Sequence, residues 1–317
     1  MLKNLISKLV SVAFDKPLAP PTNREKELVS ELKATFHGLS QLKMANLLPC
    51  EEAWLKNINR LRELVINDDP REFLRWDVIV QTMFVTNARY VKIELKYLKN
   101  HPEWRSRWRE AIKESTTGYP IPYWRYPVSS GNLIHQAYCL AKFEEQNETH
   151  VNDMDFVLEF GGGYGGMCRL LHNLGFRGKY VIFDLPPFSA LQQFYLKSTA
   201  ILVHSVESFN DAENGVICLS DLEQMMDIIP VHIEGMDSMF IATWSISEVP
   251  MDLRESILSL TSQFKTFMIA YQHQFEKVNN IEFFRNWIDT RTDIEWCNWQ
   301  LRHSPNNYYL VGKRRLL

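Results

Sequence analysis

The sequence predicts an α/β protein in which an α-helical N-terminal region precedes a mostly parallel sheet that closes with an antiparallel hairpin. Three observations predict this fold class. Apolar residues recur at helical spacing through much of the first 130 residues. Short β-rich runs then alternate with helical runs, as in a parallel sheet built from βα units. The last two β-rich runs are joined by the turn-rich segment 303–307, which is typical of a hairpin.

Composition limits the partners and the compartment. The chain has 317 residues, a net charge of −3 and a pI near 6.3, so no overall field attracts it to nucleic acid. No apolar run approaches the roughly 20 residues of a membrane-spanning helix. The five cysteines are scattered without the spacing of a zinc site, which favours free thiols in a reducing compartment. With no signal-peptide cleavage site in the sequence, we expect a cytoplasmic protein.

The first 14 residues form an amphipathic stripe with Lys3 and Lys8 beside it. Its apolar residues stand at positions 2, 5, 6, 9 and 10. Such a stripe can lie on an anionic membrane surface, here the inner face of the membrane, and more often packs on its own fold or on a partner subunit. The sequence is therefore compatible with peripheral membrane association and with a homo-oligomer.

Helix signals follow in the N-terminal region. Thr22 and Glu25 form a capping-box signal for a helix that runs to about residue 46. Asp69 and Pro70 suit the N-cap and the first turn of a long helix toward Asn100. We expect helices to dominate the chain up to residue 130.

The boundary between the two regions lies where the residue pattern changes. Residues 118–131 hold three prolines and four aromatic residues without a helical or strand period, which predicts a loop. We therefore divide the chain into a helical region, 1–130, and a sheet domain, 131–317, which opens with a helix over 132–146. The predicted strands are 156–160, 179–183, 215–219, 238–242, 266–270, 293–301 and 308–312.

The first strand of the sheet leads into a glycine-rich turn, EFGGGYGG. Gly161, Gly162, Gly163 and Gly165 let the backbone turn sharply and approach a ligand with no Cβ in the way. The helix that follows offers free N–H groups and the positive end of its dipole to a carboxylate or phosphate. Asp184 ends the next strand, where an acid can bind both hydroxyls of a ribose.

Two cofactors fit this pattern. Gly161, Gly163 and Gly166 satisfy the G-x-G-x-x-G motif of a dinucleotide site. From Glu159 the turn also reads E-x-G-x-G-x-G, the form usual in Rossmann-like methyltransferases. About 150 residues follow the turn, which suits the rest of one such sheet and is short for a dehydrogenase with its own catalytic domain. The terminal hairpin resembles the last two strands of the methyltransferase sheet, so we favour S-adenosylmethionine over NAD.

A family resemblance rests on three segments, which read FGGGYGGMCRLL, VIFDLPPFSALQQFYL and ATWSISEVP. Together they resemble the sugar O-methyltransferases found with bacterial surface-polysaccharide genes. The similarity extends from about residue 130 to about residue 312. It implies transfer of a methyl group from S-adenosylmethionine to a hydroxyl of a nucleotide-linked or glycan-terminal sugar.

Ligands in open α/β sheets lie beyond the carboxyl ends of the strands. This rule places Ser220 and Asp221 beside the adenine ring, and Thr243 near the reactive methyl group. The cofactor-binding residues that we predict are Glu159, Gly161, Gly162, Gly163, Gly165, Asp184, Leu185, Ser220, Asp221 and Thr243.

A sugar hydroxyl needs a base, because it is a poor nucleophile at neutral pH. Glu248 and His273 follow the fourth and fifth strands and are the predicted catalytic residues. Glu248 could instead cap the next helix, and His273 could be a surface histidine. The substrate-binding residues that we predict are Trp124, Arg125, His135, Trp244, Ser245 and His303.

Two further expectations concern metal dependence and a non-catalytic alternative. No group of Asp, Glu and His has convincing metal-ligand spacing, so we expect a metal-independent reaction. A catalytically silent methyltransferase-like module that binds a partner through its helical region is the alternative from another functional class. The intact glycine turn and the polar, aromatic segment 243–248 count against that alternative.

Overall fold

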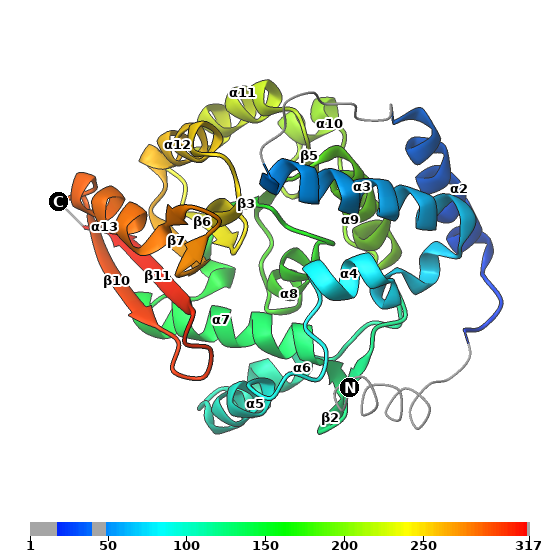
Figure 1. Cartoon of the computed structure of the whole chain (residues 1–317), viewed down its shortest axis with the longest axis horizontal. Coiled ribbons are helices and arrows are strands. Elements are labelled where there is room, and N and C mark those ends of the chain that lie inside the picture. The colour runs from blue at the N-terminus through cyan, green and yellow to red at the C-terminus, as the bar shows by residue number, and fades with distance from the viewer. Residues whose placement is uncertain (1–17, 40–48, 316–317) are drawn as a thin grey trace.

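The computed structural model describes residues 18–39 and 49–315, and the predicted amphipathic stripe of the first 14 residues lies outside them (Figure 1). The N-terminal region is helical, as predicted. Its elements are α2 (Asn23–Gly38), α3 (Pro49–Asn67), η1 (Pro70–Arg75), α4 (Asp77–Thr82), α5 (Val91–Asn100), η2 (Trp104–Trp108) and α6 (Arg109–Ala111).

The capping box at the start of α2 is confirmed, whereas the predicted end of that helix is wrong. The Glu25 amide donates to Thr22 Oγ1 over 3.2 Å, and Glu25 Oε2 accepts from the Thr22 amide over 2.7 Å. The helix ends at Gly38 because Leu39 has an extended backbone, with φ −65° and ψ 118°.

The long helix expected from Asp69 to Asn100 is also wrong. Asp69 does cap a helix, by accepting from the Arg71 amide over 3.0 Å, but that helix is the short η1. Residues 83–90 then leave the helical path because other elements bind them. The Val85 amide donates to Asn132 Oδ1 over 3.1 Å. Nearby, Asn87 Oδ1 accepts from the Trp124 amide over 3.0 Å.

The segment predicted as a loop contains a small hairpin. Strands β1 (Pro122–Tyr123) and β2 (Tyr126–Ser130) pair antiparallel, with Tyr123 opposite Tyr126. Pro122 is tolerated there because it begins its strand. The absence of a two-residue alternation hid this hairpin from the sequence.

The central sheet has seven strands in the order β10-β11-β7-β6-β3-β4-β5. The chain starts in the middle, at β3, fills one side with β4 and β5, and then crosses back to β6 and β7. These five strands are parallel, and β11 lies antiparallel between β7 and β10. The predicted fold class, a Rossmann-like methyltransferase sheet with a C-terminal antiparallel hairpin, is confirmed.

The strands agree closely with the prediction. They are β3 (Phe156–Phe160), β4 (Lys179–Phe183), β5 (Gly215–Leu219), β6 (Ser238–Thr243), β7 (Thr266–Gln272), β10 (Ile294–Gln300) and β11 (Asn307–Arg314). A short hairpin, β8 (Gln274–Phe275) with β9 (Val278–Asn279), follows β7. The helices of this part are α7 (Gly131–Asn147), α8 (Gly166–Asn173), α9 (Pro186–Ser198), α10 (Val206–Asp211), α11 (Leu222–Ile233), α12 (Met251–Leu260) and α13 (Asn280–Thr290), with short helices η3 (Val151–Asp153), η4 (Ile246–Glu248) and η5 (Thr261–Gln263).

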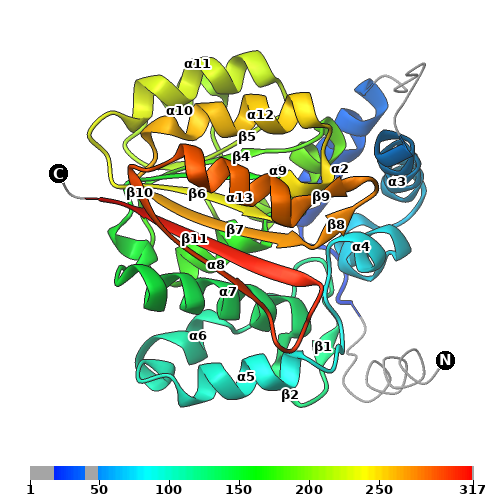
Figure 2. The same ribbon diagram turned by 60° about the vertical axis from the view of Figure 1, so that its left-hand side comes forward.

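Helices cover both faces of the sheet. Figure 2 shows α11, α12 and α13 on one side and α7 and α8 on the other, with α5 and α6 outside α7. Two apolar cores correspond to the two faces. The N-terminal helices share the core of α7, α8 and α9: Phe73 packs edge-on against Tyr195, with ring centroids 5.8 Å apart. The helical region is therefore built into the sheet domain.

A buried ion pair also joins the two regions. Arg169 of α8 donates to Glu114 Oε1 over 2.9 Å and to the Lys113 carbonyl over 2.9 Å. Both charged side chains are only about a tenth exposed, so the contact is held in a desolvated setting.

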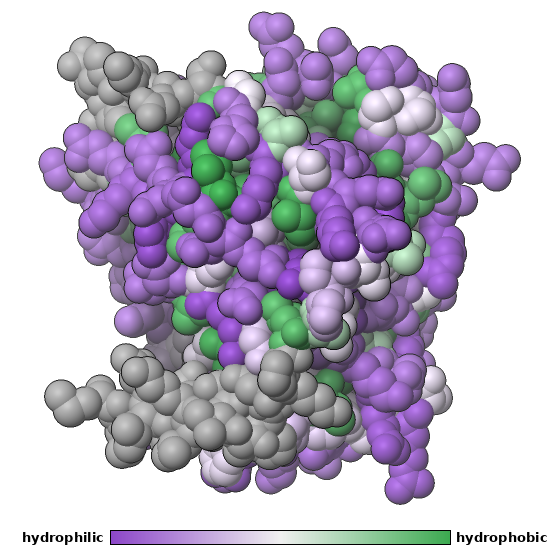
Figure 3. Space-filling view, turned by 90° about the vertical axis from the view of Figure 1, so that its right-hand side faces the viewer, coloured by the Kyte–Doolittle hydropathy of each residue, from purple (hydrophilic) through white to green (hydrophobic). Residues whose placement is uncertain are grey.

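One outer face is mostly hydrophilic. Figure 3 shows the side of α2 and α3, where the hydrophobic residues of the described part form small, separate patches. None of the helices in the described ranges is both long and apolar enough to cross a membrane.

Candidate functional site

A cavity of about 700 Å³ lies at the carboxyl ends of the strands. The residues directly after β3, β4, β5 and β6 line it, as the strand-end rule predicts. The site residues predicted from the sequence that line this cavity are Glu159, Gly161, Gly162, Gly163, Asp184, Leu185, Ser220, Thr243, Trp244, Ser245, Glu248 and His135. The opposite wall comes from α3, α4, α7 and the chain between α4 and α5.

The glycine turn is held on both sides. Gly161 has φ +72°, and its amide donates to the Phe183 carbonyl over 2.8 Å. A Cβ at Gly161 would lie 2.2 Å from Ser245 Cβ, so glycine is needed for the close approach of the two loops. The Gly163 amide donates to Asp184 Oδ2 over 2.9 Å, which ties the turn to the end of β4.

Asp184 and Glu159 are acids in a poorly solvated setting. Burial raises the pKa of Glu159 to about 8, although the Tyr180 hydroxyl donates to its carboxylate over 2.9 Å. Burial likewise raises the pKa of Asp184 to about 7, and hydrogen bonds from Leu185, Gly163 and Gln192 limit the increase. Both carboxylates are thus poised to gain from a cationic ligand.

The ionisable side chains of the cavity wall are mostly acidic. Among the described residues that line it, the ionisable side chains other than Tyr and Cys are Glu51, Glu159, Asp184, Glu248 and His135, with no lysine or arginine. Such a wall favours a positively charged ligand and disfavours phosphate groups.

Trp244 is fixed in a strained backbone conformation at the end of β6. Its φ is +63°, which is rare for a residue with a Cβ. The Trp244 amide donates to the Ala270 carbonyl, and its indole N–H donates to Asn307 Oδ1, each over 2.6 Å. Strain of this kind persists where the surroundings hold it, and it clusters at binding sites.

His135 stands opposite Trp244. The two rings stack with centroids 5.0 Å apart and an interplanar angle of 29°. His135 Nδ1 lies 2.8 Å from Oε1 of the fully buried Glu94, and His303 Nε2 lies 3.0 Å from the same oxygen. Burial alone raises the pKa of Glu94, but the two histidines outweigh it and hold that pKa below its ordinary value.

The structure separates the two predicted bases. Glu248 is half-buried on the cavity wall, and its Oε1 accepts from Gln272 Nε2 over 3.0 Å. Burial raises the pKa of Glu248. The capping alternative is not supported, because α12 begins after Pro250 without a side-chain cap. His273 is exposed and is not among the residues that line the cavity.

Other predicted site residues also lie away from the cavity. Asp221 is exposed and caps α11, since its Oδ1 accepts from the amides of Glu223 and Gln224. Gly165, with φ +89°, shapes the start of α8. Trp124 and Arg125 are exposed and contact each other, with the guanidinium 4.0 Å from the ring centroid. His303 does not line the cavity and lies behind its wall, where it contacts Glu94 and the ring of Tyr90.

Several wall residues were missed because they belong to the N-terminal helices. Met83 and Tyr90 line the cavity, and the buried Glu94 lies behind the wall, against His135. A signal for Glu94 exists in the sequence: it interrupts the apolar stripe that Val91, Leu95 and Leu98 would otherwise form on α5. An acid on the buried face of a helix needs a partner, and here the partners are histidines.

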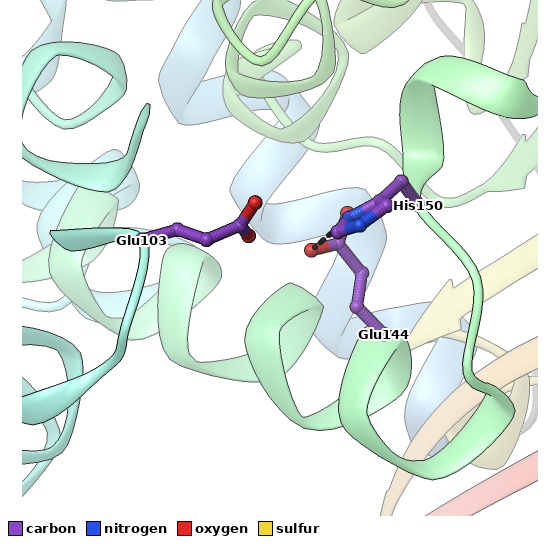
Figure 4. Close-up of side chains that lie close together, drawn as sticks. All are labelled: Glu103, Glu144 and His150. Atoms are coloured by element: carbon purple, nitrogen blue, oxygen red, sulfur yellow. Dashed lines mark ion pairs between the residues drawn. The ribbon is translucent and has the colours of Figure 1, made fainter. Parts of the chain in front are cut away.

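A second group of ionisable residues lies away from the cavity. Glu103, Glu144 and His150 bring ligand atoms within 4.8 Å of one another (Figure 4). The guanidinium of Arg107 contacts all three: it donates to Glu144 Oε1 over 2.6 Å and reaches His150 Nδ1 at 3.2 Å and Glu103 Oε2 at 3.5 Å. A cation is thus already supplied by the chain, and we assign no metal to this group.

Known proteins similar to this chain are found among solved structures. No protein-family model matches the chain, and no curated protein matches it significantly. Among solved structures, the methyltransferase domain of bacterial CtHen1 aligns with a TM-score of 0.41 and 10% identity over 57% of this chain and 97% of that one. Magnesium protoporphyrin IX methyltransferase from Synechocystis PCC 6803, solved with bound SAM, aligns with a TM-score of 0.39 and 12% identity over 73% and 100%.

An rRNA methylase from Streptococcus thermophilus aligns with a TM-score of 0.37 and 14% identity over 57% of this chain and 96% of that one. TM-scores this low carry no inference about cofactor or acceptor.

Proposed function

We propose that the protein is an S-adenosylmethionine-dependent O-methyltransferase that acts on a hydroxyl of an uncharged sugar. The observation that carries the proposal is the cavity beyond the carboxyl ends of the strands. It combines the glycine turn and Asp184 with a wall of acidic residues and no lysine or arginine among the described lining residues.

The residues present fit this cofactor. The glycine turn would approach its methionine part, and the acids Glu159 and Asp184 would face its positive charge and its ribose hydroxyls. The bound cofactor supplies an electrophilic methyl group on a sulfonium. The protein's share of the work is to align an oxygen with that group and to exclude water from it.

The same wall disfavours NAD. A dinucleotide brings a pyrophosphate with two negative charges, which would repel Glu159 and Asp184 in their ionised forms and, unlike a cation, could not lower their raised pKa values. No basic side chain among the described lining residues offsets that repulsion. Charge therefore separates two cofactors that the glycine motif alone leaves open.

Charge also bears on the acceptor. A nucleotide-linked sugar carries a diphosphate, whereas the non-reducing end of a glycan carries none, so the acidic wall favours the glycan end. The aromatic rings of Trp244 and Tyr90 offer apolar faces for a sugar ring. The sugar class itself is drawn from the family resemblance of the three sequence segments.

Calorimetry with each cofactor tests the first half of the proposal. We expect heat from S-adenosylmethionine and S-adenosylhomocysteine and none from NAD. Incubation with neutral glycans and with nucleotide sugars, read as a mass gain of one methyl group, tests the second half. Binding of NAD alone would overturn the proposal, and binding of neither cofactor would favour the silent module.

A further inference from the structure

Glu94, His135 and His303 come from three distant parts of the chain. Glu94 lies on α5, His135 on α7 and His303 in the loop between β10 and β11. The two imidazoles meet one carboxylate oxygen, Glu94 Oε1, at 2.8 and 3.0 Å. Glu94 is fully buried, and its Oε2 makes no hydrogen bond with the described residues. The two histidines are thus the direct partners of its charge.

This geometry fixes the tautomer of His135. An ionised carboxylate only accepts hydrogen bonds, so the nitrogen facing it, Nδ1, must carry a proton. In the neutral ring Nε2 is then the basic nitrogen. Stacking on Trp244 holds the ring plane, and His135 lies on the cavity wall.

We propose that His135 is the base of the methyl transfer and that Glu94, held by His303, is its positioning residue. This inference rests on the proposed function. Nε2 of His135 takes the proton of the acceptor hydroxyl while an oxygen electron pair forms the bond to the methyl carbon. The electron pair of the broken S–CH₃ bond stays on sulfur, which becomes a neutral thioether. The positive charge thus ends on the imidazolium, beside the carboxylate of Glu94.

Phenols and a thiol also lie around Glu94 and His135. Burial raises the pKa of each neighbouring phenol and thiol on α5, β1, α7 and β11, so these groups stay neutral near pH 7. They are Tyr90, Tyr123, Tyr138, Cys139 and Tyr309.

Substitutions separate His135 from Glu248, the other candidate base on the wall. His135→Ala is expected to lower kcat by about 100-fold or more, to leave the affinity for S-adenosylhomocysteine within about twofold, and to regain turnover when imidazole is added. Glu94→Gln keeps a hydrogen-bond acceptor without the charge. It should lower kcat by about tenfold and move the acid limb of the kcat profile to lower pH. His204→Asn is the matched control and should match the wild type, because the His204 ring contacts the Asn214 carbonyl and Phe209 and does not line the cavity.

The inference is overturned if His135→Ala keeps kcat within about threefold of the wild type. It is also overturned if Glu248→Gln alone loses turnover and recovers it at high pH, since Glu248 would then be the base. If Glu94→Gln fails to fold, His135→Ala with imidazole rescue decides the matter.

A readout that needs no turnover keeps this inference apart from the proposed function. Nitrogen-15 NMR of the histidine rings should show His135 protonated at Nδ1, with a signal that changes in Glu94→Gln. Protonation of neutral His135 at Nε2 would exclude the arrangement. A wild-type protein that shows the expected tautomer but methylates no acceptor would contradict the proposed function instead.

Discussion

Glu159 and Asp184 are two acids whose charge depends on what fills the cavity. Burial raises the pKa of Glu159 to about 8 and that of Asp184 to about 7. Because both values are raised in the folded protein, the neutral acids stabilise it below their ordinary pKa, and this contribution is lost as pH rises through about 7 and 8. A cationic ligand favours the ionised acids and offsets that loss.

Binding of S-adenosylmethionine should therefore release protons. We expect the affinity to rise by about tenfold between about pH 6 and about pH 8, because the acids must ionise to meet the cation. Calorimetry in buffers of different ionisation enthalpy measures the released protons. Glu159→Gln should reduce the release, and a pH-independent affinity in the wild type would contradict the assignment.

At Gly161 a side chain would be both strained and too close to a neighbouring loop. An alanine there would combine φ +72° with a Cβ 2.2 Å from Ser245 Cβ, so the turn after β3 and the loop after β6 would be forced apart. Gly161→Ala should destabilise the protein by about 1–3 kcal/mol and abolish cofactor binding. Chemical denaturation and calorimetry measure the two effects.

Gly38→Ala is the matched control for that substitution. A Cβ at Gly38 would have nothing within 4 Å, and the residue ends an α-helix. We expect a change of at most about 1 kcal/mol and unchanged binding. Equal losses in both variants would mean that the close approach of the two loops is unimportant.

At the scale of elements, Asp221 belongs to a helix cap. Its Oδ1 accepts from the amides of Glu223 and Gln224 at the start of α11. Asp221→Ala should cost about 0.5–2 kcal/mol of stability, with cofactor affinity within about twofold of the wild type. Asp221→Asn, which preserves the cap, should cost less. A fall in affinity without a loss of stability would restore the predicted contact with the adenine ring.

The five parallel strands were predictable because each stands between turn signals and is mainly apolar. The glycine turn and the residues after β3 to β6 were predictable for a related reason, since strand ends in a parallel sheet meet at one edge. The N-terminal helices were harder. The break at residues 83–90 depends on hydrogen bonds to Asn132 and from Trp124, which a local pattern does not contain.

The candidate site, too, could be predicted only in part from the sequence. Strand ends nominate Glu248 and His273 equally, but only the register of the loops decides that Glu248 faces the cavity and His273 faces outward. His135 and His303 look like unrelated histidines in the sequence. Only the tertiary fold brings both to Glu94.

On the scale of the whole molecule, the two regions predicted from the sequence should unfold together. Residues of the N-terminal helices and of α7, α8 and α9 form one apolar core, and the pair Arg169–Glu114 crosses between them. We expect a single calorimetric transition for the full chain. A chain of residues 131–317 alone would lose the part of that core that the N-terminal helices supply, and it should lack a cooperative transition. Two separate transitions, or a folded 131–317 chain, would show that the boundary at residue 130 divides independent domains.

The position of β11 has a consequence for protein synthesis. This eight-residue strand lies between β7 and β10, although both precede it in the chain. A nascent chain on the ribosome therefore carries β7 with an open edge until β11 has emerged, and an open edge invites pairing with other chains. The same strand brings Asn307 to the indole of Trp244. Translation that stops before β11 would thus yield an aggregation-prone polypeptide with an unfinished cavity, and the last strand to be made completes the sheet and the site together.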